Sequence, residues 1–176
     1  HEQPTCDVEG LHSIVRPVDP ADPYGETFTY YYQLIDRPGD GPTIVHIPGG
    51  PGVPSIGQIP AGIPEDIDVV LTDPRGVGCN ADGAPHDAGF YGTETFSTDV
   101  LAVIEDLALH DYIIYGHSYG TVLSTVVASR WAKVVAGAGS VRSSAGTYTA
   151  CTEVMEPLVV DVMRSCMEPI SVASVG

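Results

Sequence analysis

Basic residues are scarce in this chain. Only seven of its 176 residues are Lys or Arg, against 23 Asp or Glu, and the formal net charge at pH 7 is −16. A surface with that excess of carboxylates repels the phosphates of nucleic acids and of anionic lipids. We therefore expect no nucleic acid partner, and we interpret most of the carboxylates as a solvated acidic surface.

Long apolar runs, cofactor motifs and metal-ligand clusters are missing as well. No apolar run reaches the roughly 18 residues needed to span a membrane, so we expect no membrane span. The patterns GxGxxG and GxxxxGK[ST], which cradle nucleotide phosphates, do not occur, and no metal-ligand cluster is visible. We expect neither a cofactor nor a metal. The chain starts at His1 without Met or a visible signal peptide, which suggests that a preceding segment was removed.

Cysteines are few, and none has the CxxC spacing of a zinc site. The four are Cys6, Cys79, Cys151 and Cys166. An even number permits disulfides and therefore an exported protein. Cys151 and Cys166 lie in one segment and are candidates for pairing. We expect a secreted or periplasmic protein, and the alternative is a cytoplasmic protein with four reduced thiols.

Short apolar runs alternate with helical patterns along the first three quarters of the chain. We expect strands at Leu11–Arg16, Thr27–Ile35, Thr43–Ile47, Asp68–Thr72, Tyr112–Tyr115 and Lys133–Ala136, and helices at Ser97–His110 and Gly120–Trp131. Ser97 or Thr98 is the expected cap of the first helix. Strands that are apolar throughout are typical of a parallel sheet covered on both faces. The fold class is α/β with a mostly parallel sheet, and the earlier strands are candidates for an antiparallel edge.

The segment Gly116-His117-Ser118-Tyr119-Gly120 stands between a predicted strand and a predicted helix. GxSxG in that context is the nucleophile elbow, a turn so sharp that Gly116 and Gly120 must lack side chains. It presents Ser118 beside the unpaired N–H groups of a helix amino terminus. We predict that Ser118 is a catalytic nucleophile and that the N–H of Tyr119 is one donor of an oxyanion hole.

A second glycine-rich segment follows an earlier strand. Pro48-Gly49-Gly50-Pro51-Gly52 comes directly after Thr43–Ile47. Glycines let backbone N–H groups approach a reacting carbonyl without interference from a Cβ atom. We therefore expect the second oxyanion donor to be the N–H of Gly49 or of Gly50.

Three segments in this order resemble the proline iminopeptidase family of α/β-hydrolases, including its secreted tripeptidyl-aminopeptidase-like relatives. They are 46–52 (HIPGGPG), 73–78 (DPRGVG) and 116–121 (GHSYGT), and the resemblance runs from about Thr27 to Arg130. The family shows HGGPG where this chain has PGGPG, so Pro48 replaces its leading His, and His46 lies two residues earlier. The chain looks like the nucleophile-bearing half of an α/β-hydrolase core.

The resemblance implies hydrolysis of an amide or ester at the amino end of a peptide, by a Ser-His-Asp triad and through an acyl-enzyme. The segment around Asp73 and Arg75 is mainly structural in that family. We expect these two residues to form a buried or half-buried ion pair that braces the loops near the site.

No histidine follows Ser118, although the triad of this fold runs in the order Ser, acid, His. We expect residues 1–136 to form the hydrolase core and 137–176 to be the start of a cap or an irregular tail. The missing Asp and His would lie on a second polypeptide or on a longer version of this one, or the domain would be catalytically silent. A fourth route would use His46 as the base.

Three functions remain open from the residues alone. The first is an aminopeptidase acting on short peptides, and the second is a carboxylesterase that uses the same triad on small esters. The third is a non-catalytic binding domain on a hydrolase scaffold, which only the absent histidine favours. Ser at the elbow argues against dehalogenases and epoxide hydrolases, which need Asp there.

Overall fold

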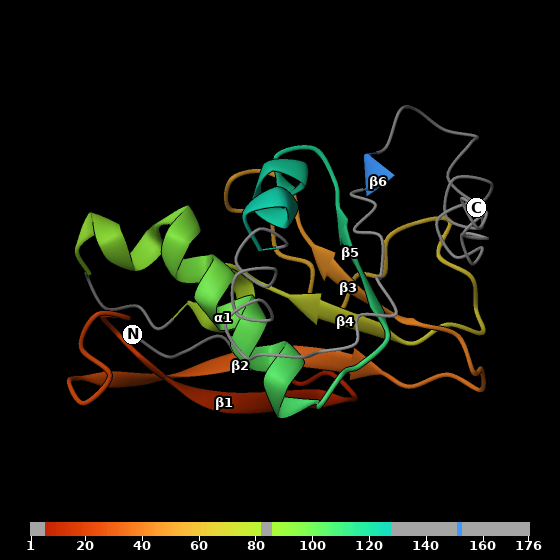
Figure 1. Cartoon of the computed structure of the whole chain (residues 1–176), viewed down its shortest axis with the longest axis horizontal. Coiled ribbons are helices and arrows are strands. Elements are labelled where there is room, and N and C mark those ends of the chain that lie inside the picture. The colour runs from red at the N-terminus through yellow and green to blue at the C-terminus, as the bar shows by residue number, and fades with distance from the viewer. Residues whose placement is uncertain (1–5, 82–85, 128–150, 153–176) are drawn as a thin grey trace, which may run out of the picture.

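A six-stranded sheet forms the centre of the computed structural model, which describes residues 6–81, 86–127 and 151–152 (Figure 1). The strand order across the sheet is β1-β2-β4-β3-β5-β6. The strands are β1 (Leu11–Pro17), β2 (Thr27–Ile35), β3 (Thr43–Ile47), β4 (Val69–Thr72), β5 (Tyr112–Gly116) and the two-residue β6 (Cys151–Thr152).

The sheet is parallel at one end and antiparallel at the other. β3 runs parallel to β4 and to β5, and β5 runs parallel to β6. β1 and β2 are antiparallel to each other, and β2 is antiparallel to β4. This arrangement confirms the predicted mostly parallel α/β sheet with an antiparallel edge. Because β3, β4 and β5 are parallel neighbours, their carboxyl ends meet at one edge, where the predicted site residues follow the strands.

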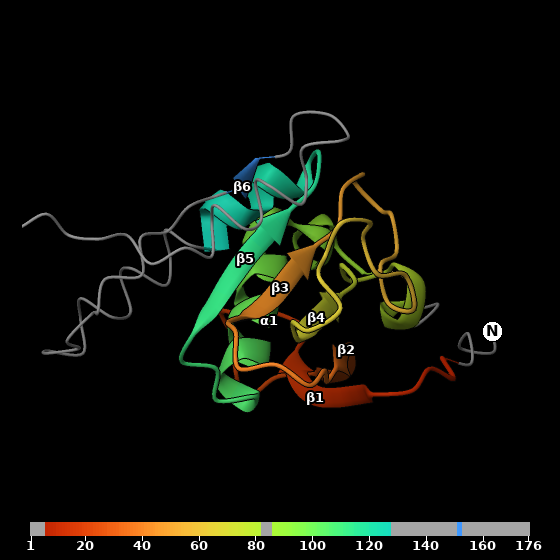
Figure 2. The same cartoon turned by 90° about the vertical axis from the view of Figure 1, so that its right-hand side faces the viewer.

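The helix α1 (Thr93–Asp106) packs on one face of the sheet, as the two views in Figures 1 and 2 show. It begins four residues before the predicted start at Ser97, and its cap is Gly92. The predicted caps were wrong because Ser97 and Thr98 lie inside the first turns, where each hydroxyl donates to the carbonyl three residues earlier. Glu94 in the first turn suits the positive end of the helix dipole. Two short 3₁₀ helices, η1 (Gly78–Asn80) and η2 (Ala88–Tyr91), precede it.

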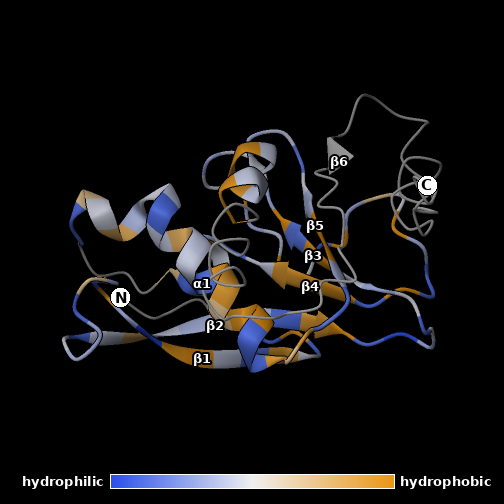
Figure 3. Cartoon of the chain, in the orientation of Figure 1, coloured by the Kyte–Doolittle hydropathy of each residue, from blue (hydrophilic) through white to orange (hydrophobic). Residues whose placement is uncertain are grey.

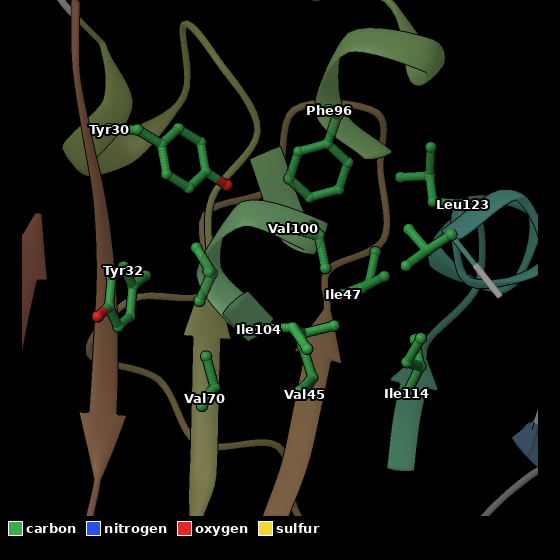
Figure 4. Close-up of a cluster of buried hydrophobic side chains, with 12 residues drawn as sticks. Tyr30, Tyr32, Val45, Ile47, Val70, Phe96, Val100, Ile104, Ile114 and Leu123 are labelled. Atoms are coloured by element: carbon green, nitrogen blue, oxygen red, sulfur yellow. The ribbon is translucent and has the colours of Figure 1, made fainter. Parts of the chain in front are cut away.

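Each face of the parallel strands is buried in its own apolar cluster. Alternate residues of β3 point to opposite faces, so Val45 and Ile47 join α1 in one cluster and Ile44 joins the other. Figure 4 shows side chains of β2, β3, β4 and β5 meeting Phe96, Val100 and Ile104 of α1. β4, in the middle of the sheet, is apolar over most of its length (Figure 3).

The second face is also covered, and among the described residues the cover is an irregular segment. The stretch between β3 and β4 supplies Ile56, Ile63 and Ile67, which are at most 8% exposed. Tyr115 of β5 belongs to the same cluster. This segment therefore continues from the glycine-rich loop directly into the core, and the core holds the loop in place.

A disulfide joins Cys6 to Cys79, across 73 residues of sequence. It attaches the segment before β1 to the loop after β4. The suggested partner of Cys151, Cys166, lies outside the described residues, so that pairing stays a prediction. None of the helices within the described ranges has the length and apolarity needed to cross a membrane.

The predicted helix at Gly120–Trp131 is helical over residues 120–127, where its description ends. The predicted strand Lys133–Ala136 lies outside the described residues. So does the expected cap or tail, 137–176, apart from the two residues of β6. The division into a core and a cap stays a prediction.

Candidate active site

Ser118 follows β5 in a left-handed backbone conformation, with φ = +54°. Only one other described residue that is not glycine, Ala108, has a positive φ. The carbonyl of Ser118 accepts the N–H of Thr121 at 3.0 Å, which starts the turn into the helix at 120–127. The strand, the strained serine and the helix thus follow one another within a few residues, as a nucleophile elbow requires, and the catalytic role of Ser118 stays a prediction.

The two elbow glycines are required by close backbone approach. A Cβ atom on Gly116 would lie 2.2 Å from the carbonyl oxygen of Gly120 and 2.2 Å from the Oγ of Ser124. A Cβ on Gly120 would lie 2.4 Å from the carbonyl oxygen of Ile47, at the end of β3. Real Cβ contacts are not this short, so any side chain at either position would push the elbow apart.

The glycine-rich loop lies directly against the elbow. A Cβ on Gly49 would lie 2.9 Å from the carbonyl oxygen of His117 and 3.2 Å from the Cβ of Ser118. Gly50 has φ = +118°, a conformation that favours glycine. The pairing of β3 with β5 explains the proximity, because Ile47 at the end of β3 is opposite Gly116 at the end of β5.

The predicted oxyanion donors are therefore brought to one place. Among the described residues, none accepts a hydrogen bond from the N–H of Gly49, Gly50 or Tyr119. Unpaired N–H groups beside a serine hydroxyl are the feature that an oxyanion hole requires. The geometry does not choose between Gly49 and Gly50, and the role of all three stays a prediction.

The side chain of Tyr119 lies at the surface and reaches across to α1. It is 36% exposed, and its hydroxyl is 3.2 Å from the Oγ1 of Thr93, the first residue of that helix. Sequence analysis missed Thr93. No local signal marks it, because the contact depends on how α1 lies against the elbow.

Asp73 does not pair with Arg75, so the expected ion pair was wrong. Its buried carboxylate accepts the backbone N–H groups of Ser55 at 2.5 Å, Ile56 at 3.1 Å and Cys79 at 3.2 Å. Burial raises the pKa of the Asp73 carboxyl, and these hydrogen bonds act in the opposite direction. Asp73 thus ties the segment after the glycine-rich loop to the end of β4.

Arg75 pairs instead with Asp99 of α1. Its Nε and Nη2 lie 2.6 and 2.8 Å from the two carboxylate oxygens, and both side chains are at most 1% exposed. The guanidinium also lies 4.4 and 4.8 Å from the ring centroids of Phe28 and Phe90, which contact each other, and Arg16 contacts Asp99 at 3.0 Å. Asp99 was missed, although an acidic residue within the apolar pattern of a predicted helix is a signal that a buried partner exists.

His46, the suggested alternative base, is buried at the end of β3. It is 5% exposed, and its ring is 5.7 Å from that of Tyr115. Its Nδ1 has no hydrogen-bond partner among the described residues. Burial, with a smaller contribution from His117, lowers the pKa of His46 from 6.5 to about 4.

Such an imidazole is a weak proton acceptor, which disfavours the use of His46 as the base. Within the described ranges, no side chain forms a hydrogen bond with the Ser118 hydroxyl, so no base is assembled there. In the same ranges, no group of three His, Cys, Asp or Glu side chains is placed to hold a metal ion.

Several solved structures share this fold at low sequence identity. A proline iminopeptidase from Mycobacterium smegmatis is 23% identical, with a TM-score of 0.51 over 68% of this chain and 40% of that one. A proline iminopeptidase-related protein from Thermus thermophilus is 23% identical, with a TM-score of 0.54 over 70% and 41%. A probable hydrolytic enzyme from Pseudomonas aeruginosa is 19% identical, with a TM-score of 0.55 over 70% and 38%.

At these identities the likeness concerns the fold, and the chain spans about 40% of the length of these structures. A search of curated protein sequences found no significant match. The family model described as the alpha/beta hydrolase fold matches residues 42–174, from the start of β3 onward and through the elbow. Together with the mostly parallel sheet and its edge of site residues, this match shows that the chain belongs to the α/β-hydrolase family.

Proposed function

We propose that this protein is a serine hydrolase in which Ser118 forms an acyl-enzyme. The observation that carries the proposal is the strained conformation of Ser118, at φ = +54°, beside backbone N–H groups that have no partner in the described structure. A non-glycine residue in that conformation is disfavoured and tends to persist where function requires it. A plain strand-to-helix turn would need neither the strain nor the glycines around it.

In the proposed reaction, the Oγ of Ser118 attacks the carbonyl carbon of the substrate. Negative charge then develops on the carbonyl oxygen, and the N–H of Tyr119 together with that of Gly49 or Gly50 donates to it. Fixed donors stabilise this charge well because they need little reorganisation during the reaction. Asp73 contributes indirectly, because its hydrogen bonds to Ser55 and Ile56 anchor the segment that follows the glycine-rich loop.

The histidine that removes the Ser118 proton, and the acid that orients it, would come from outside these 176 residues. They would lie on a second polypeptide or on a longer form of this chain. The absence of any histidine after Ser118 and the coverage of about 40% of the related structures support this arrangement. The histidine would return the proton to the leaving group, and water would then hydrolyse the acyl-enzyme.

The substrate we propose is a short peptide that is cleaved at its amino end. The support is the order of the three motifs at 46–52, 73–78 and 116–121, together with a structural neighbour that is itself a proline iminopeptidase. The disulfide between Cys6 and Cys79 is in keeping with a secreted or periplasmic protein, since such bonds persist in oxidising compartments.

The test is intact-mass spectrometry of the purified protein before and after reaction with a fluorophosphonate probe. We expect one adduct in the wild type and none in Ser118→Ala. Ser13→Ala, a change of an exposed serine at the opposite edge of the sheet, should keep the adduct. A co-purifying second polypeptide would identify the source of the missing residues.

Turnover of amino-acyl anilides against simple acyl esters then separates the peptidase from an esterase. Anilide cleavage that is lost in Ser118→Ala is the expected result. Ester cleavage alone would remove the peptidase assignment. A protein that takes no probe and turns over neither substrate would favour a binding domain on a hydrolase scaffold.

A further inference from the structure

Tyr119 has a second feature besides its backbone N–H. The side chain of Tyr119 starts at the elbow, because the Cβ atom of Tyr119 is only two bonds from its backbone nitrogen, which we expect to bind the oxyanion. Any acyl group attached to Ser118 whose carbonyl oxygen reaches that N–H must therefore lie close to the Tyr119 side chain. Tyr119 is 36% exposed as a residue, so it offers surface to a ligand.

The far end of the same ring is tied to another element. The Tyr119 hydroxyl lies 3.2 Å from the Oγ1 of Thr93, 26 residues away in sequence and at the start of α1. An exposed aromatic side chain normally exchanges between rotamers. This hydrogen bond selects one of them, in which the ring bridges the gap between the elbow and α1.

α1 is itself firmly placed. Val100, Val103 and Ile104 are at most 1% exposed in the core, and Asp99 is ion-paired to both Arg75 and Arg16. Thr93 is thus a stationary anchor, and its hydrogen bond fixes the position of the Tyr119 ring.

We propose that Tyr119 is a specificity-determining residue for the acyl group of the substrate, and that Thr93 is its positioning residue. The ring, held by Thr93, favours large apolar acyl groups over small ones. This inference rests on the proposed function, because it requires an acyl group on Ser118.

The test compares two p-nitrophenyl esters that differ only in the acyl group, 3-phenylpropionyl and acetyl. In Tyr119→Ala we expect the ratio of kcat/KM for the large ester to kcat/KM for the acetyl ester to fall at least about tenfold, because aromatic contact area is lost. Thr93→Val and Tyr119→Phe each remove one hydroxyl of the pair. Each should lower the ratio of the two kcat/KM values by about three- to fivefold, the effect of one hydrogen bond.

The double variant Thr93→Val/Tyr119→Phe should be no worse than either single one, because both remove the same hydrogen bond. Thr93→Ser, which keeps the hydroxyl, should restore the ratio. The matched control is Thr125→Val, since Thr125 is an exposed threonine whose hydroxyl also donates to a nearby oxygen, and its ratio should equal that of the wild type.

Three results would overturn the inference. One is an unchanged ratio in Tyr119→Ala while turnover still depends on Ser118, which leaves the proposed function intact. Another is an equal loss with both esters in Thr93→Val, which would mean general damage to the fold. The third is a wild type without turnover that depends on Ser118, because then the proposed function fails and this inference fails with it.

Discussion

At the scale of single residues, the turn at Ser118 depends on two glycines that have no Cβ atom. Gly116 and Gly120 are in contact with backbone oxygens at distances that leave no room for a methyl group. Neither glycine needs a positive φ, which among the elbow residues occurs at Ser118. The two glycines therefore allow the close approach, and the serine carries the backbone strain.

We predict that Gly116→Ala abolishes the elbow. Its new Cβ would lie 2.2 Å from the carbonyl oxygen of Gly120, which cannot retreat without opening the turn. The expected result is a loss of fluorophosphonate labelling of at least about 100-fold, with a fall in the free energy of unfolding of about 2–4 kcal/mol.

Gly89→Ala is the matched control for that variant, because a Cβ atom there would meet no atom within 4 Å. It should label normally and change the free energy of unfolding by less than about 0.5 kcal/mol. Normal labelling of Gly116→Ala would show that Ser118 does not depend on the elbow geometry.

His46 makes a second prediction at this scale, on the pH dependence of stability. Its pKa is about 4 in the folded protein and about 6.5 when unfolded. Above pH 6.5 the imidazole is neutral in both states and has no effect. Between pH 6.5 and 4 the unfolded chain binds a proton that the folded one does not. The free energy of unfolding therefore decreases as the pH falls through this range, by about 3 kcal/mol in total.

The measurement is the free energy of unfolding of the wild type and of His46→Gln from about pH 8 to about pH 4. Above pH 6.5 the difference in free energy of unfolding between the two proteins should be constant. Below pH 6.5 the wild type should lose stability relative to His46→Gln as the pH falls. The raised pKa of Asp73 acts in the opposite direction, but it is present in both proteins and cancels. Parallel curves would contradict the prediction.

At the scale of elements, one charged cluster joins α1 to the antiparallel edge of the sheet. Arg75 donates to both carboxylate oxygens of Asp99. It also donates to the carbonyls of Pro17, the last residue of β1, and of Val18, which follows it. Arg16 of β1 adds a bond to the carbonyl of Thr98. α1, β1 and the loop after β4 are therefore held together at one point, near the middle of α1.

We predict that Asp99→Ala destabilises the protein by about 3–5 kcal/mol, because it leaves the buried guanidinium of Arg75 without a carboxylate. Arg16→Ala should lower stability by only about 1 kcal/mol, because the Arg16 side chain is 19% exposed and the main pair remains. Denaturant unfolding of both variants checks this order, and equal losses would contradict it.

At the scale of the whole molecule, the disulfide connects the amino-terminal segment to the loop that carries Asp73. Cys79 is bonded to Cys6, and its own N–H donates to the Asp73 carboxylate. The same carboxylate anchors Ser55 and Ile56. A chain of direct contacts thus leads from the start of the described chain to the segment behind the glycine-rich loop.

We predict that Cys6→Ser/Cys79→Ser lowers the free energy of unfolding by about 4 kcal/mol, the loop-closure entropy for a bond across 73 residues. Reduction of the wild type with dithiothreitol should give the same loss in thermal or denaturant unfolding. The double variant should not respond to reduction. A response would reveal a second bond, and an unchanged stability would contradict the prediction.

Much of the fold could be predicted from local patterns. The bounds of β2 and β3 agree with the predicted ones, because β-branched and aromatic runs are bounded there by turn residues. The position of Ser118 followed from glycines at fixed offsets from it. These features depend on neighbours within a few residues, which a sequence displays directly.

The partners of the charged and sulfur-bearing side chains were decided only by the tertiary structure. Arg75 meets Asp99 rather than Asp73, Cys6 meets Cys79, and Tyr119 meets Thr93. These pairs are 24, 73 and 26 residues apart, and several partners of similar chemistry exist for each. The sequence by itself determined strands β1 to β5, the tight turn at Ser118 and the family, because these depend on local patterns, whereas β6 was not predicted. Packing of α1 and the loops against the sheet determined the pairings, because only packing brings distant residues together.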